Sequence, residues 1–180
     1  MGISTFNQLI TGCVISCGVV YGMGEEELFG QFKQALEQKE PLKIYGKGAN
    51  QIPTIHVDDL AQLAFDTAFS DRKGFQFGVD HSRNTQKELL EGISLAIGNG
   101  QVTESLIEDG FLEADYDIWA ADIRVDPQCL PALQLWKCKE GLVAGMGSVV
   151  GEFNLARGLK PNKIFIHGTP ASGKSRLAEM

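Results

Sequence analysis

Residues 168–175 match the pattern G-x-x-x-x-G-K-(S/T), which binds phosphate when a strand leads into it and a helix follows. The matching residues are Gly168, Thr169, Pro170, Ala171, Ser172, Gly173, Lys174 and Ser175, and Arg176 comes next. The mostly apolar residues 163–167 precede the pattern, and the good helix formers 176–180 follow it. This order predicts the strand, loop and helix of a phosphate-binding loop.

The residue types of this loop suit ATP with Mg²⁺. Glycines let successive backbone N–H groups face a phosphate, and the following helix adds the positive end of its dipole. Lys174 can reach the β and γ phosphates and is the predicted catalytic residue, while Ser175 is the predicted ligand of Mg²⁺. The alternative is a glycine-rich turn with an exposed lysine, but the predicted flanking strand and helix favour phosphate binding.

A second glycine-rich stretch, residues 145–151, is similar to a dinucleotide-binding fingerprint with one extra residue. No strand pattern precedes it, and no acidic residue follows at the spacing that would hold a ribose. We therefore interpret it as a turn that leads into a helix.

Up to about residue 107, strand patterns alternate with helix patterns, which predicts an α/β fold. Strands are predicted at 14–21, 42–45 and 75–79, with a shorter one before Asp58. Helices are predicted at 25–38, after Asp58 or Asp59 as N-cap, and from a capping box at 85–88 through Ile97. The second helix is expected to bury Leu60, Leu63, Ala64 and Ala68.

Strand patterns fade between residues 111 and 159, and short amphipathic segments favour helices. Residues 157–161 are typical of a linker. The sequence therefore predicts an α/β domain at 1–110, a helical connector at 111–161, and the beginning of a phosphate-loop domain at 162–180.

Charge and composition exclude several functional classes. The net charge is −7, and residues 104–126 hold eight acidic side chains against the single base Arg124, so binding to nucleic acid or to an anionic membrane is not expected. No apolar run reaches the ~18–20 residues of a membrane span. The four cysteines and three histidines lack the spacing of a zinc site, and free thiols in a reducing cytosol are the simpler interpretation.

Three stretches resemble a known family. Gly18-Val19-Val20-Tyr21-Gly22, followed by residues 52–61, resembles the second half of an NAD-dependent epimerase/dehydratase-type short-chain dehydrogenase domain, which is Rossmann-like. Residues 157–161, running toward the phosphate loop, resemble the junction in the adenylate kinase 7 family, which joins such a domain to an adenylate kinase domain. The order of these stretches makes the resemblance specific, and it implies that the chain is a fragment.

The sequence also departs from this family. The glycine-rich dinucleotide turn and the Tyr-x-x-x-Lys pair of the dehydrogenase superfamily are absent, so NAD binding and redox chemistry are not expected. His56 and Asp58 are better interpreted as strand-end and cap residues than as an acid–base pair. Ser175 and Arg176 stand where classical adenylate kinases often carry Gly and Thr.

The resemblance implies a nucleoside monophosphate kinase that converts ATP and AMP into two ADP. It also implies a location in the cytoplasm, which includes the cilium or flagellum, and partner proteins of the axoneme. The AMP site, the lid and the arginines that stabilise the migrating phosphoryl group would follow Met180, so the chain alone is expected to be inactive. Two alternatives stay open: a non-catalytic dehydrogenase-like scaffold that binds a partner protein, and another small-molecule P-loop kinase.

Overall fold

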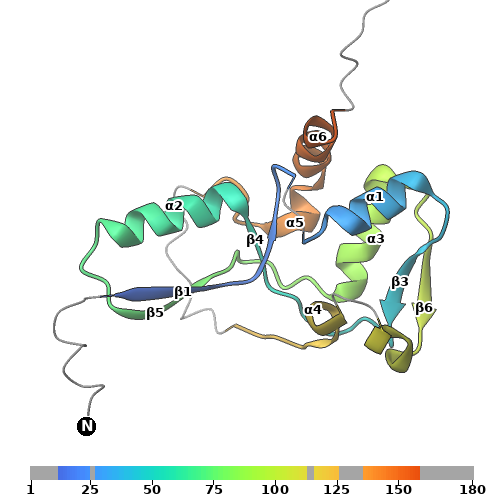
Figure 1. Ribbon diagram of the computed structural model, residues 1–180, viewed down its shortest axis with the longest axis horizontal. Helices are drawn as coiled ribbons and strands as arrows, with labels where there is room; N and C mark the ends of the chain where they lie inside the picture. The colour runs from blue at the N-terminus through green and yellow to red at the C-terminus, as the bar shows by residue number, and fades with distance from the viewer. Residues whose placement is uncertain (1–11, 25–26, 113–115, 126–135, 159–180) are drawn as a thin grey trace, which may run out of the picture.

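The computed structural model of the protein describes residues 12–24, 27–112, 116–125 and 136–158. Helices and strands alternate through most of this part (Figure 1). The strands are β1 (Cys13–Cys17), β2 (Val19–Tyr21), β3 (Leu42–Tyr45), β4 (Thr54–His56), β5 (Gly74–Gly78) and β6 (Val102–Ser105). The helices are α1 (Phe29–Glu37), α2 (Val57–Ala68), α3 (Gln86–Ile97), the 3-10 helix η2 (Ile107–Leu112), α4 (Tyr116–Ala120), α5 (Gly141–Ala144) and α6 (Met146–Ala156).

The strands form three parallel pairs, β1 with β5, β2 with β4, and β3 with β6. The single strand predicted at 14–21 is wrong in one respect, because Gly18 divides it into β1 and β2. A Cβ atom at Gly18 would lie 2.4 Å from the carbonyl oxygen of Pro53, so only glycine fits this close approach of two backbones. Beyond Gly18 the chain therefore changes its partner from β5 to β4.

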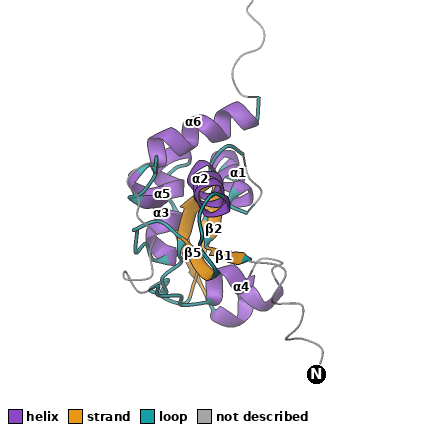
Figure 2. Ribbon diagram, turned by 90° about the vertical axis from the view of Figure 1, so that its left-hand side faces the viewer, coloured by secondary structure: helices purple, strands orange, loops and turns teal. Residues whose placement is uncertain are grey.

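The main core lies where α1, α3, α5 and α6 pack around β3 and the end of β2. Figure 1 places α2 alongside β1 and β5, away from this core, and Figure 2 shows α6 beyond the other helices. The apolar faces of the helices supply most of the core: Leu28, Phe32, Ala35, Leu89, Leu90, Ile93, Leu142, Met146, Val149 and Phe153. Burial of these side chains from water is the main stabilising contribution.

The local signals of the sequence are confirmed where they depend on neighbouring residues. The capping box opens α3, because Thr85 Oγ1 accepts a hydrogen bond from the Glu88 N–H while Glu88 accepts one from the Thr85 N–H. The helix then ends at Ile97. The sequence does not predict β6, which becomes a strand by pairing with β3, with Leu42 opposite Val102 in the register.

Two expectations for α2 are wrong. Its N-cap is His56, which has an extended backbone and whose Nδ1 accepts a hydrogen bond from the Asp58 N–H, so Asp58 and Asp59 lie in the first helical turn. Ala64 and Ala68 are exposed, since the helix rests on the β1–β5 pair through Leu60 and Leu63.

Within the predicted connector, the described residues form the helices α4, α5 and α6, whereas 121–125 and 136–140 are not helical. The helices α5 and α6 pack against α3. The residues 145–151 also behave as predicted from their pattern, because Gly145 is the N-cap of α6. None of the helices in the described ranges is long and apolar enough to cross a membrane. The domain boundaries at 110 and 161 stay predictions.

Candidate functional site

The predicted phosphate site lies outside the described residues. This applies to every residue of the set: Gly168, Thr169, Pro170, Ala171, Ser172, Gly173, Lys174, Ser175 and Arg176. Their roles in binding ATP and Mg²⁺ therefore stay predictions from the sequence. Within the described part, the candidate site is a group of polar side chains where the start of α2 meets the segment leading into α5 and α6.

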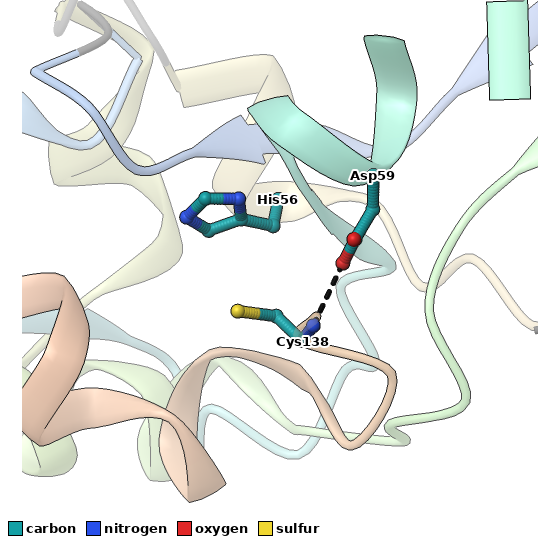
Figure 3. A group of neighbouring side chains, drawn as sticks. All are labelled: His56, Asp59 and Cys138. Atoms are coloured by element: carbon teal, nitrogen blue, oxygen red, sulfur yellow. Dashed lines mark hydrogen bonds between the residues drawn. The ribbon is translucent and has the colours of Figure 1, made fainter. Parts of the chain in front are cut away.

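We call this group the polar cluster, and it consists of Tyr21, His56, Asp59, Lys137, Cys138 and Glu152. His56, Asp59 and Cys138 are all buried, and their ligand-type atoms lie within 4.8 Å of one another. Figure 3 shows the His56 ring above the Cys138 side chain, with the Asp59 carboxylate directed at the backbone nitrogen of Cys138. The cluster thus joins residues from β4, α2 and the approach to α5.

His56 is fixed through both of its ring nitrogens. Nδ1 accepts a hydrogen bond from the Asp58 N–H at 3.2 Å, so the ring proton resides on Nε2. Nε2 can then donate to Glu152 Oε2, which lies 2.9 Å away. Tyr21 packs edge-on against the ring, with centroids 5.3 Å apart. These contacts define a single tautomer and orientation for a histidine with no exposed surface.

Asp59 attaches the start of α2 to the segment before α5. One carboxylate oxygen accepts from the Lys137 N–H at 2.7 Å and the other from the Cys138 N–H at 2.9 Å (Figure 3). The aspartate is almost fully buried, and charge-assisted bonds to two backbone donors compensate for its burial.

The carboxylate of Glu152, on α6, accepts hydrogen bonds from three donors. Oε2 accepts from His56 and from the Met23 N–H at 3.1 Å, and Oε1 accepts from Lys137 Nζ at 2.8 Å. Burial works to raise the pKa of Glu152, but the hydrogen bonds from Lys137 and His56 outweigh it and hold the pKa below its usual range. The hydrogen bond to Glu152 in turn raises the pKa of Lys137. The pair is therefore charged near neutral pH.

Tyr21 and Cys138 complete the cluster in their neutral forms. Burial and then the Asp80 carboxylate raise the pKa of Tyr21, and burial and then Asp59 raise the pKa of Cys138. A thiolate is the reactive and metal-binding form of cysteine, so a raised pKa opposes both roles for Cys138.

The composition of the cluster, His, Asp and Cys, contains the ligand types of a zinc site, but the contacts do not fit one. Both nitrogens of His56 and both oxygens of Asp59 already take part in hydrogen bonds, and a metal at His56 Nε2 would have to displace Glu152. The hydrogen bonds of His56, Asp59 and Glu152 form a buried network that rigidifies the packing of three segments, whereas the buried hydroxyl of Tyr21 has no hydrogen-bond partner within the described residues. The Asp58 carboxylate lies 3.9 Å from His56 Nδ1, within ion-pair distance, and no hydrogen bond joins the two side chains.

The sequence identifies only part of this cluster. The prediction that His56 ends a strand is confirmed, but the cap predicted at Asp58 or Asp59 is His56 itself. Lys137, Cys138 and Glu152 carry no signal in the sequence, because they lie 78 to 96 residues from Asp59 and His56, their partners at the start of α2. Only the fold brings them together.

Solved structures with a similar fold are nucleotide-sugar epimerases and related proteins. The human epimerase family protein SDR39U1, solved with NADPH, superposes with a TM-score of 0.65 at 20% identity, covering 77% of this chain and 48% of that one. The UDP-glucose 4-epimerase of Thermus thermophilus, solved with NAD, gives 0.58 at 18% identity, covering 84% and 50%. The described part of the chain thus has the Rossmann-like fold of the epimerase and short-chain dehydrogenase class, as predicted.

Comparison with curated proteins is more specific. Adenylate kinase 7 of Macaca fascicularis and adenylate kinase 7 of Mus musculus are each 32% identical over 175 residues, or 92% of this chain. The predicted resemblance to the adenylate kinase 7 family is therefore confirmed. The chain spans 33% of the macaque protein and 28% of the mouse protein, and no family model matches it.

Proposed function

We propose that this chain is part of a nucleotide kinase of the adenylate kinase type, which transfers a phosphoryl group from ATP to AMP. The observation that carries the proposal is the phosphate-loop pattern at 168–175 in a chain related to adenylate kinase 7. A pattern of this kind is short and can arise by chance, but its position after an apolar segment and before helix formers is the context that phosphate binding requires.

The roles of the loop residues follow from the chemistry of phosphoryl transfer, which depends on positioning and on stabilisation of charge. The backbone of residues 168–173 would surround the phosphates of ATP. Lys174 would stabilise negative charge on the migrating phosphoryl group, and Ser175 would hold the Mg²⁺ that accompanies ATP. Arg176 would add positive charge at the start of the following helix.

The epimerase-like part is proposed to be a non-catalytic scaffold. The observation in favour is the polar cluster, where the hydrogen bonds of His56, Asp59 and Glu152 all serve to join segments of the fold. In addition, the sequence has no Tyr-x-x-x-Lys pair. The proposal includes a location in the cytoplasm, with the cilium or flagellum, and partner proteins of the axoneme. Both rest on the family resemblance alone.

The kinase proposal is tested with a form of the protein in which an adenylate kinase domain is complete. Lys174→Ala is expected to lower kcat by about 10²-fold or more, which corresponds to a few kcal/mol of barrier, with little change in melting temperature. Lys160→Ala, which removes a lysine in the linker before the loop, is the matched control and should keep full activity. Transfer to AMP is compared with transfer to other small acceptors, which distinguishes an adenylate kinase from another P-loop kinase.

Two results would contradict the proposal. A kcat for Lys174→Ala within threefold of the parent, together with a lower melting temperature, would make Lys174 a structural residue. Efficient transfer to a different acceptor with none to AMP would exclude the adenylate kinase type. The 180-residue chain itself is expected to show no turnover above its own Lys174→Ala variant.

A further inference from the structure

The β3–β6 pair has an open edge at the margin of the molecule (Figure 1). β6 pairs with β3 along one side, and no other strand in the described ranges pairs with it. An edge of this kind presents a row of N–H and C=O groups that can hydrogen-bond to a further strand. Glu104 is the one exposed residue of β6, so a strand added at this edge would meet a carboxylate.

A groove begins where β6 ends. It has a volume of about 680 Å³ and lies between the turn after β3 and the first turn of η2. Leu106 and Ile107 supply its apolar part, with exposed fractions of 68% and 52%. The groove is continuous with the edge, because Glu104 and Ser105 belong both to β6 and to the lining of the groove. We call residues 102–109, which form the edge and most of the groove, the β6 surface.

Contacts within the chain hold the β6 surface in place. The Gly46 N–H donates to the Ser105 carbonyl at 2.9 Å, and Ile107 lies 3.2 Å from the position of a Cβ atom at Gly46. Leu106 and Asp109 are joined twice, since the Leu106 N–H donates to Asp109 Oδ2 and the Asp109 N–H donates to the Leu106 carbonyl, each at 3.2 Å. A surface that is already ordered loses little conformational entropy when a partner binds.

The β6 surface is negatively charged. Glu104, Glu108 and Asp109 line the groove, and Lys47 is the one base among its lining residues. Neither Glu104 nor Glu108 forms an ion pair within the described part of the chain. The following sequence adds to this charge, because residues 104–126 hold eight acidic side chains against the single base Arg124. A partner with positive charge is therefore favoured.

An open edge, an apolar groove and unpaired carboxylates on one surface together specify the chemistry of a partner. We propose that the β6 surface binds an extended segment of another protein, which carries lysine or arginine beside an apolar side chain. The backbone of this segment adds as a third strand next to β6, and its cations pair with Glu104 and Glu108. Its apolar side chain contacts Leu106 and Ile107. This inference goes beyond the proposed function, because neither the kinase reaction nor the scaffold role identifies a binding surface.

Charge opposes other occupants of the β6 surface. An acidic side chain on a short edge strand also protects a protein from aggregation through that edge. Glu104 and Glu108 would repel the same residues of a second copy of this chain, as well as nucleic acid and anionic lipid. The same carboxylates attract a basic segment. Protection from self-association and recognition of a basic partner are therefore compatible.

The test uses the whole 180-residue chain and, as a probe, a short synthetic peptide in which lysine alternates with valine. Calorimetry measures binding, and amide hydrogen exchange should slow at residues 102–105 when the peptide is present. Two control peptides separate the contributions. Glutamate in place of lysine reverses the charge, and proline in place of valine removes N–H groups that an added strand must donate. Each control should bind at least about tenfold more weakly than the lysine–valine peptide.

Variants of the chain locate the binding surface. Glu104→Lys should weaken binding of the lysine–valine peptide by about tenfold or more, because it reverses the charge beside the added strand. Asp71→Lys is the matched control, since it changes the net charge equally at an exposed position between α2 and β5, far from β6 (Figure 1), and it should bind as the parent does.

A second pair of variants tests the apolar part of the groove. Leu106→Ser should weaken binding by about fivefold, because it removes apolar contact without changing charge. Leu155→Ser, which alters a leucine with an exposed fraction of 52% on α6, should leave binding unchanged. Circular dichroism verifies that each variant is folded.

Three results would overturn the proposal. The first is the absence of binding between the lysine–valine peptide and the folded chain. The second is equal binding of that peptide and either control peptide, which would remove the charge match or the added strand from the account. The third is an equal loss of binding in Glu104→Lys and Asp71→Lys. No kinase activity enters these measurements, so their failure leaves the proposed function untouched.

Discussion

The imidazole of His56 and the carboxylate of Glu152 lie 2.9 Å apart, although 96 residues separate them in the chain. His56 ends β4 and caps α2, while Glu152 lies within α6. Their hydrogen bond therefore joins the last helix of the described part to the strand that begins the α2 unit. Since the His56 ring has no exposed surface, water cannot replace Glu152 as its partner.

Removal of the Glu152 carboxylate should destabilise the fold. Glu152→Ala leaves His56 Nε2 and the Met23 N–H without their acceptor, and a buried polar group without a partner costs about 1–3 kcal/mol. We expect the free energy of unfolding in urea to fall by about 2–4 kcal/mol. Ser148→Ala, at an exposed position on the same helix, is the control and should change stability by less than about 0.5 kcal/mol. Equal effects of the two substitutions would show that the hydrogen bonds of Glu152 contribute little.

The same carboxylate should make stability depend on pH in the acidic range. The folded-state pKa of Glu152 lies below its ordinary value of 4.5, so the folded state binds this proton less readily than the unfolded state does. The contribution of ionised Glu152 to the free energy of unfolding is therefore complete above pH 4.5. It is lost as the pH falls through the folded-state pKa. Glu152→Gln should remove this part of the pH dependence, which urea unfolding between about pH 3 and pH 7 would measure. A variant with the same slope as the parent would contradict the prediction.

Local sequence signals predict the elements that depend on local interactions. The α3 helix is predicted correctly because Thr85 and Glu88 satisfy its first N–H groups within one turn. By contrast, β6 is missed because Val102–Ser105 has no strong strand pattern of its own and depends on β3 as a partner. The predicted cap of α2 is wrong because Asp59 uses its carboxylate for the distant backbone of Lys137 and Cys138.

The polar cluster shows what local sequence patterns cannot predict. No spacing rule connects His56 with Cys138 or Glu152, since their contact arises from the packing of α5 and α6 against β4 and α3. Sequence reasoning therefore identifies the epimerase-like fold and the strand that leads into α2, but not the hydrogen-bond network that joins α2 to α6. The phosphate loop is the opposite case, because its signal is contained within consecutive residues, 168–175.

NAD should not bind tightly to this chain. The glycine-rich residues 145–151 follow α5 and form the start of α6, whereas a dinucleotide turn must follow a strand. Calorimetric titration with NAD and NADH is expected to show no micromolar binding. If such binding occurred and Gly147→Val abolished it, the interpretation of this stretch as a turn into a helix would be wrong.

Two glycines should respond to alanine in opposite directions. Gly22 has φ +97°, and an added Cβ atom would lie 2.2 Å from His56 Nε2, the nitrogen that bonds Glu152. Gly22→Ala therefore combines backbone strain with displacement of a fully buried ring, and the free energy of unfolding should fall by about 2–4 kcal/mol. Gly147 lies inside α6 with no atom within 4 Å of an added Cβ, so Gly147→Ala should raise stability by about 0.5–1 kcal/mol through helix propensity. Urea unfolding of both variants under one buffer condition measures the difference. A Gly22→Ala protein as stable as the parent would mean that His56 can move away without cost, and the tight arrangement of His56 and Glu152 described above would be incorrect.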